Sequence, residues 1–331
     1  MKAIHLLIGG TGFIANELIK NLLEIDCEIL CIDDDTSNNF DTTSKSFNKH
    51  SKIKFYLGDV NYETTIDWII QQVGDSPVTI WHLAANSDIR SGSSSPNLDA
   101  QKTFLTSISV CNLIDRLKVD YVNFASTSAV YGELSDGGSF VEDSICSPIS
   151  YYGIAKQSSE QFLEIKTSSS NVPLLIFRFA NIVGAPATHG VIYDFINKIK
   201  TQNEVLEVLG NGTQTKSYLH VEGLVEMMLN LWVKKETGIF NLGPGDTGIT
   251  VRQIAECVVD HLLEPRKIEY GESPRGWEGD AVRVLMDTSK LELIFSSAKI
   301  SSSQAIHRAV HDIAHQLELA IVCRNIHELN G

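Results

Sequence analysis

Short apolar runs alternate with helical patterns through about residue 180, and this alternation restricts the fold more than any other feature of the chain. Each run is nearly continuous in apolar residues, which is typical of strands buried on both faces of a sheet. Strands separated by helices form βαβ units, so an α/β fold with a doubly wound parallel sheet is predicted. The six runs are Ile4–Ile8, Glu28–Ile32, Lys54–Leu57, Val78–Leu83, Tyr121–Ala125 and Leu174–Phe179.

Beyond residue 180 the pattern is more broken, with helices expected at Ile192–Lys200, Gly223–Lys234 and Val251–Leu263. A chain of 331 residues has room for two domains. We therefore predict a sheet domain over residues 1–180 and a smaller, mixed C-terminal domain over residues 181–331. The smaller domain should hold the substrate, and some of its segments should return to the sheet.

Composition excludes several classes of protein. The formal net charge of −14 argues against a nucleic-acid partner, because such surfaces need a basic stripe. No apolar run is long enough to span a membrane, and the N-terminus lacks the pattern of a secretory signal, so a cytoplasmic protein without membrane contact is expected. No C-x-x-C pair occurs, so reduced thiols, without disulfides or a bound metal, are expected. The cysteines are Cys27, Cys31, Cys111, Cys146, Cys257 and Cys323.

The first run leads into a glycine-rich turn, "GGTGFIA", and then into a helical stretch. Gly10, Gly12 and Ala15 satisfy G-x-G-x-x-A, and Gly9 gives the alternative G-x-x-G-x-x-A. Glycines let backbone N–H groups approach a pyrophosphate at the positive end of a helix. Asp33 follows the second run, 21 residues after Gly12, where a carboxylate accepts hydrogen bonds from ribose hydroxyls. The spacing predicts a Rossmann-type dinucleotide site, and an acid with no arginine just after it favours NAD over NADP.

Two later strand ends fit the same cofactor. Asp59, in "LGDV", lies where an adenine amino group could bind, and Ala84 and Ala85, in "WHLAAN", leave room for the cofactor backbone. Each is equally compatible with an ordinary strand end.

A third group of residues indicates catalysis. "NFASTSAVYG" places Thr127 at the end of a parallel strand, where sheets of this type bind ligands. Tyr152 and Lys156, in "SYYGIAK", are four residues apart and share one face of a predicted helix. An ammonium and a nicotinamide cation would lower the pKa of the tyrosine towards use as a base. A helix-surface pair is the alternative interpretation.

With these motifs the chain resembles the extended short-chain dehydrogenases/reductases, in particular the NAD-dependent nucleotide-sugar epimerase/dehydratase branch. The resemblance also rests on "FRFANIVG", "LGNGTQTKSYLHV" and "RGWEGD", and these later blocks are most similar to UDP-hexose 4-epimerases. It implies a base at Tyr152, its partner at Lys156, and a supporting hydroxyl at Thr127. The cofactor contacts it implies are Gly9, Gly12, Phe13, Ile14, Asp33, Asp34, Asp59, Val60, Leu83, Ala84, Ala85, Tyr152 and Lys156. The substrate contacts it implies are Thr127, Ser128, Asn181, Lys216 and Arg275.

Three departures from the family pattern stand out. "TFLTS" lacks the usual asparagine before the catalytic strand, Gly223 replaces an aspartate, and Lys216 replaces an arginine that faces the diphosphate. Surface charge is the alternative interpretation of Lys216 and Arg275.

The reaction is inferred by comparison with the family's branches. Dehydratases carry an Asp-Glu pair after the catalytic threonine, and decarboxylases a glutamate two places after it, whereas this chain has Ser128 and Ala129. Epimerisation at C4 through a 4-keto sugar is therefore predicted, with a UDP-sugar as the favoured substrate. A 4-keto-sugar reductase, a UDP-uronate epimerase and a non-catalytic NAD-binding sensor remain alternatives. The resemblance also implies a homodimer formed by the helical regions around Asn97–Leu117 and Tyr151–Lys166.

Overall fold

The computed structural model describes residues 3–86, 88–134, 138–201, 205–261, 266–277, 279–295 and 300–319. The chain divides into two compact units. The first comprises Met1–Val130, Ser150–Arg178 and Met228–Phe240, and the second Tyr131–Ile149, Phe179–Met227 and Asn241–Gly331. Cys323, Glu278 of "RGWEGD" and Leu263, the predicted end of the last helix, lie outside the described residues.

A seven-stranded sheet forms the centre of the first unit, and its strand order is β11-β6-β5-β4-β1-β2-β3. β1 pairs in parallel with both β2 and β4, β2 with β3, and β4 with β5. The strands are β1 (Ala3–Ile8), β2 (Cys27–Asp33), β3 (Ile53–Leu57), β4 (Val78–His82), β5 (Val119–Thr127), β6 (Leu174–Phe179) and β11 (Gly238–Leu242). All six predicted runs are strands of this sheet, which confirms the Rossmann-type fold. β11 comes from beyond residue 180 and pairs at the edge of this sheet.

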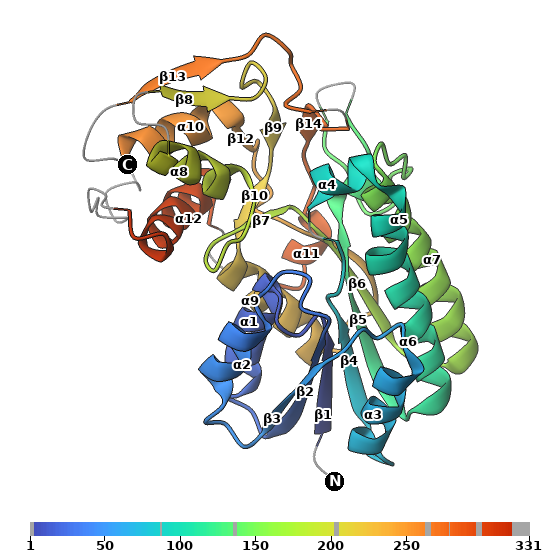
Figure 1. Cartoon of the computed structure of the whole chain (residues 1–331). Helices are drawn as coiled ribbons and strands as arrows, with labels where there is room; N and C mark the ends of the chain where they lie inside the picture. The colour runs from blue at the N-terminus through green and yellow to red at the C-terminus, as the bar shows by residue number, and fades with distance from the viewer. Residues whose placement is uncertain are drawn as a thin grey trace. The chain divides into compact units, whose positions relative to one another are not determined.

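Helices cover both faces of the sheet (Figure 1), which explains the nearly continuous apolar runs. One face packs its strand residues against apolar side chains of α3, α6 and α7. The helices are α1 (Phe13–Leu22), α2 (Phe40–Phe47), α3 (Glu63–Val73), α4 (Ile89–Ser94), α5 (Pro96–Asp99), the π-helix η1 (Ala100–Phe104), α6 (Leu105–Arg116), the 3-10 turn η2 (Ser128–Val130) and α7 (Tyr151–Ser170). α9 (Val221–Val233) runs from the second unit into the first.

The second unit has small sheets and its own apolar core. This core is built from α8, α10 and α12 with β8 and β10. Its helices are α8 (Val191–Thr201), α10 (Val251–Asp260), α11 (Ser289–Glu292) and α12 (Ser302–Gln316). Its strands are β7 (Asn181–Val183), β8 (Val205–Val208), β9 (Thr215–Lys216), β10 (Tyr218–His220), β12 (Ile249–Thr250), β13 (Lys267–Tyr270) and β14 (Arg283–Val284).

A single boundary at residue 180 does not describe how the chain is divided between the two units. Residues 131–149 belong to the second unit and residues 228–240 to the first. The physical reason is pairing between distant segments. Phe140 bridges to Met286 within the second unit, while the end of α9 leads into β11 of the sheet. In the described part of the chain, no helix is both long and apolar enough to cross a bilayer.

Candidate active site

The glycine-rich turn between β1 and α1 has the geometry of an anion site. Gly9 has a φ of +83°, and a Cβ there would lie 2.6 Å from the backbone nitrogen of Ala84. Gly12 is the N-cap of α1, and within the described residues no side chain caps its first turn, which also contains no acid. The hydroxyl of Thr11 is buried without a hydrogen-bond partner. This open, positive helix end fits a dinucleotide pyrophosphate, with the N–H groups of Phe13 and Ile14 available to it.

Three predicted acids gather beside this turn, together with a lysine. Asp33 Oδ2 accepts a hydrogen bond of 3.0 Å from the Thr11 backbone N–H, so the carboxylate braces the turn. Lys102 forms an ion pair with Asp34 and lies 3.4 Å from Asp59 Oδ2. Burial raises the pKa of Asp33. Burial alone would also raise the pKa of Asp34, but hydrogen bonds from Lys102 and Thr36 lower it below its usual value.

The strand end of β4 closes the same edge of the sheet. The Leu83 backbone N–H donates to Ile8 O at 2.8 Å, and Ala84 packs under Gly9. The Asn86 N–H donates to the Thr103 hydroxyl at 3.0 Å. Thr103 lies in the π-helix η1 and belongs to the "TFLTS" departure, so a hydroxyl supports this loop where the family has an asparagine. Of the other predicted contacts here, Val60 is buried and Ala85 is half-buried.

The predicted catalytic residues lie together in the first unit. Thr127 ends β5, and its hydroxyl hydrogen-bonds the Tyr152 side chain from α7. Lys156, one turn along α7, is buried, and its Nζ lies 6.0 Å from the centre of the Tyr152 ring. That ammonium donates to Ala125 O at 2.6 Å and lies over the Phe124 ring at 4.8 Å. The structure therefore brings the three predicted side chains to the C-terminal end of a sheet strand, where ligands bind in this fold.

Burial has the largest effect on the pKa values of this group. Burial raises the pKa of Tyr152, the nearby Asp99 carboxylate raises it further, and the Thr127 hydrogen bond lowers it. Burial lowers the pKa of Lys156 to about 7, although Glu160 opposes this effect. The predicted lowering of the Tyr152 pKa by Lys156 together with a nicotinamide cation stays a prediction. Within the protein alone, Lys156 does not offset the effect of burial on that pKa. The reason is that the ammonium is itself desolvated and bound to a backbone carbonyl.

A buried ion pair fixes the helix that carries Tyr152. Glu160 of α7 accepts hydrogen bonds of 3.0 and 2.7 Å from Arg178 of β6, and both side chains are at most 5% exposed. Glu160 also accepts a hydrogen bond from Ser126, the neighbour of Thr127. This network ties α7 to two strands, and it therefore holds Tyr152 in register with Thr127.

The predicted substrate residues Asn181, Lys216 and Arg275 lie in the second unit. Lys216 Nζ contacts Asp280 Oδ1 at 2.6 Å, and Arg275 donates to the Asp280 backbone carbonyl at 2.5 Å. Arg275 also pairs with Glu133 at 2.6 Å. The two cations therefore converge on Asp280 rather than lying on the surface as unrelated charges. Asn181 Nδ2 donates to Ser217 O at 3.2 Å, one residue from Lys216. Ser128, the remaining predicted contact, is buried in η2 of the first unit.

Sequence reasoning missed Lys102, Glu160, Asp99 and Asp280. Glu160 had a usable signal, because it lies four residues after Lys156 and eight after Tyr152, on the same side of one helix. Asp280 is the last residue of the quoted block "RGWEGD", but its contact with Lys216 spans 64 residues. Lys102 and Asp99 also act across long sequence separations, so only the folded chain shows these contacts.

Comparisons with known proteins agree with this geometry. The family model described as "NAD dependent epimerase/dehydratase family" matches residues 5–243. A UDP-glucose 4-epimerase of Corynebacterium glutamicum is 24% identical over 86% of this chain and 87% of its own length. A UDP-glucuronate 4-epimerase of Thermodesulfobacterium geofontis is 23% identical over 95% of this chain and 97% of its own. The crystal structure of a UDP-galactose 4-epimerase superposes with a TM-score of 0.82 at 28% identity, covering 95% of this chain and 99% of that one. The chain belongs to the NAD-dependent epimerase/dehydratase family.

Proposed function

We propose that this protein is an NAD-dependent nucleotide-sugar epimerase that inverts C4 of a UDP-hexose. The observation that carries the proposal is the contact of Thr127 with Tyr152, above buried Lys156, in a unit that also has an open glycine turn. The named relatives and the UDP-galactose 4-epimerase structure support the same reaction class.

In this proposal Tyr152 is the acid–base group. Its phenolate takes the proton from the O4 hydroxyl, and Thr127 orients that oxygen by a hydrogen bond. Bound NAD supplies a reversible acceptor for the C4 hydride, so the sugar becomes a 4-keto sugar. Lys156, whose Nζ lies 6.0 Å from the centre of the Tyr152 ring, would support the phenolate by its charge. After the 4-keto sugar has turned over in the site, Tyr152 would give the proton back to O4, and the reversible acceptor would allow C4 to be restored with the opposite configuration.

The same proposal assigns the cofactor and substrate contacts. Gly9, Gly12, Phe13 and Ile14 hold the pyrophosphate, while Asp33 binds the adenosine ribose. In the second unit, Lys216 and Arg275 bind the substrate diphosphate and Asn181 the nucleotide sugar. Two cations held beside each other by Asp280 suit a diphosphate, whose charge exceeds that of one cation. Ser128 and Ala129 replace the acids that elimination requires, which favours epimerisation over dehydration.

A panel of substrates tests the reaction. Purified protein is incubated with UDP-glucose, UDP-galactose, their N-acetyl forms and UDP-glucuronate, and the C4 epimers are followed by NMR. We expect interconversion of one 4-epimer pair with no net consumption of added NADH. Net oxidation of NADH would identify a 4-keto-sugar reductase, and epimerisation of the glucuronate alone would identify a uronate epimerase. Tight NAD binding with no turnover of any sugar would favour a sensor.

We also propose that the protein is a homodimer formed through α6 and α7. α6 exposes Leu105, and the exposed large apolar side chains of α7 recur at helical spacing: Tyr151, Ile154, Phe162 and Ile165. Ile165 is 73% exposed, which is unfavourable for an isolated surface. Light scattering should give the dimer mass for the wild type and the monomer mass for Phe162→Asp/Ile165→Asp. A monomeric wild type at micromolar concentration would contradict this assignment.

We also propose that the enzyme works in a reducing compartment, the cytoplasm, where buried thiols such as Cys27 and Cys31 stay reduced.

A further inference from the structure

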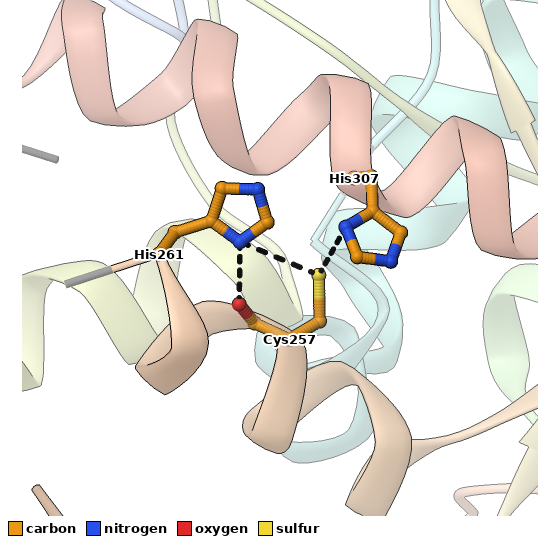
Figure 2. A group of neighbouring side chains, drawn as sticks. All are labelled: Cys257, His261 and His307. Atoms are coloured by element: carbon orange, nitrogen blue, oxygen red, sulfur yellow. Dashed lines mark hydrogen bonds between the residues drawn. The ribbon is translucent and has the colours of Figure 1, made fainter. Parts of the chain in front are cut away.

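A thiol and two imidazoles meet in the second unit, within its own core (Figure 2). Cys257 lies on α10 and His261 directly follows that helix, so the two residues are four apart and share a face. His307 comes from α12, fifty residues later in the chain. The Cys257 sulfur lies 3.3 Å from His307 Nδ1 and 3.8 Å from His261 Nδ1. One ligand atom from each residue falls within 4.8 Å of the other two.

These distances are close to those of a metal site. Four ligands around a tetrahedral zinc ion, with bonds of about 2.0–2.3 Å, lie roughly 3.5 Å apart. The two sulfur–nitrogen distances already bracket that value. The remaining separation, between the ligand nitrogens of the two imidazoles, is at most 4.8 Å, and a rotation of the imidazole side chains would close it.

The surroundings also suit a structural metal. Cys257 is 6% exposed and His261 5%, and they adjoin the apolar core formed by residues such as Val258, Ile306 and Val310. His307 is only half-buried, which leaves a route for an ion to enter. Thiolate and imidazole are the ligands that zinc prefers, whereas calcium and magnesium need oxygen.

We propose that Cys257, His261 and His307 bind one zinc-class divalent cation that joins α10 to α12. The Cys257 thiol loses its proton and forms a sulfur–metal bond, and the two neutral imidazoles each donate a nitrogen lone pair. His261 Nδ1 gives up its 2.7 Å hydrogen bond to the Cys257 carbonyl when it turns to the metal. Water or a small anion fills the fourth position. No electron is transferred, and one proton is released for each ion bound.

The site lies outside the residues assigned to the reaction, and its role is structural. A metal bond between elements fifty residues apart stabilises the second unit, because it forms only in the folded chain. The sequence-based expectation of no metal considered only C-x-x-C pairs. Cys257 and His261 form a C-x-x-x-H pair, but the third ligand comes from another helix, and only the folded chain shows that contact.

Cobalt provides the most specific test, because a thiolate–cobalt bond gives a near-ultraviolet charge-transfer band and tetrahedral cobalt gives strong visible bands. Full-length protein without a histidine tag is reduced, stripped with a chelator and titrated with Co²⁺. We expect both sets of bands, saturating at one ion per chain, and their loss when Zn²⁺ is added. Binding of Zn²⁺ should release about one proton per ion, detected with a pH indicator.

Variants locate the site. Cys257→Ala should remove the charge-transfer band, and His307→Gln should weaken cobalt binding at least about 100-fold. His307→Gln changes a half-buried residue, so it remains informative if Cys257→Ala does not fold. Cys323→Ala/His327→Ala is the matched control, because it removes the other C-x-x-x-H pair of the sequence, which lies outside the described residues. Zn²⁺ should raise the melting temperature of the wild type and the control, but not that of His307→Gln.

Wild-type protein without a thiolate–cobalt band would overturn the proposal, and so would a band that His307→Gln leaves at wild-type affinity. A band that disappears only in Cys323→Ala/His327→Ala would also overturn it, because the thiolate would then belong to another site.

Discussion

The first unit contains a buried ion pair between a helix and a strand, whereas the second unit pairs the cations of its candidate substrate site with acids from loops. In the first unit, Glu160 on α7 meets Arg178 on β6, and both are nearly inaccessible. In the second unit, Arg275 is 40% exposed and meets Glu133, 142 residues away in the chain. Rigid elements keep reacting atoms in place, while partly exposed ion pairs can exchange one partner for another.

This difference suggests a division of labour. The chemistry of proton and hydride transfer needs fixed geometry and is the same for every sugar, so its residues lie on a helix and a strand. The residues proposed to hold the nucleotide diphosphate already have acidic partners, and a substrate would replace Asp280 and Glu133 as partners of the cations. The two regions should therefore respond differently to substitution.

The largest expected effect is on the chemistry of the first unit. Tyr152→Phe should lower kcat by about 10³-fold or more, because the sugar hydroxyl loses its base. NAD content should stay at the wild-type level, since the phenol is only one of the groups proposed to hold the cofactor. Steady-state turnover and cofactor release on denaturation measure both. Tyr151→Phe, one residue earlier and 49% exposed, is the control and should keep wild-type activity. Activity within tenfold of wild type in Tyr152→Phe would refute the base assignment.

The second prediction compares how much each of the two ion pairs contributes to the free energy of unfolding. Arg178→Met leaves the Glu160 carboxylate buried without its cation, which should reduce the free energy of unfolding by about 3–5 kcal/mol. Arg275→Met breaks a more exposed pair and should reduce it by about 1 kcal/mol or less. Denaturant titrations of both variants provide the measurement. Equal losses in the free energy of unfolding would contradict the account, because the buried pair would then contribute no more to stability than the exposed pair.

A smaller effect is expected on substrate affinity. Lys216→Met should raise KM for the nucleotide sugar about 10-fold with kcat nearly unchanged, because it removes a contact made equally in the ground and transition states. Lys216→Arg keeps the charge and should have a KM close to or below that of the wild type. A fall in kcat with KM unchanged would place Lys216 in the chemistry instead of in substrate binding.

The smallest effect concerns pH. The Asp99 carboxylate raises the pKa of Tyr152, since a negative charge opposes formation of the phenolate. Asp99→Asn removes that charge, so the pKa of Tyr152 should fall and the rising limb of the kcat–pH profile should move to lower pH. Asp75→Asn changes an exposed acid and should leave the profile in place. A shift to higher pH in Asp99→Asn would contradict the assigned electrostatics.

The sequence predicted the first unit better than the second, for physical reasons. The inner strands β1, β2, β4, β5 and β6 are largely buried and therefore read as apolar runs, whereas the edge strand β3 is only partly buried. Tyr152 with Lys156 depends only on helical spacing. The glycine turn likewise depends on local backbone requirements. The partners of Lys216 and Arg275, in contrast, come from segments up to 142 residues away, and no local pattern encodes such contacts. The burial that raises the pKa of Tyr152 is a property of the folded chain, so no sequence pattern indicates it.

The central claim is that the sugar C4 is oxidised and reduced again within one turnover, and deuterium at that carbon tests it directly. UDP-hexose labelled with deuterium at C4 is converted in ordinary water, and the product is examined by NMR and mass spectrometry. Full retention of the label at C4 of the inverted sugar is the result we predict. Loss of the label to solvent, or its accumulation in reduced cofactor, would contradict a hydride that leaves and returns at the same carbon.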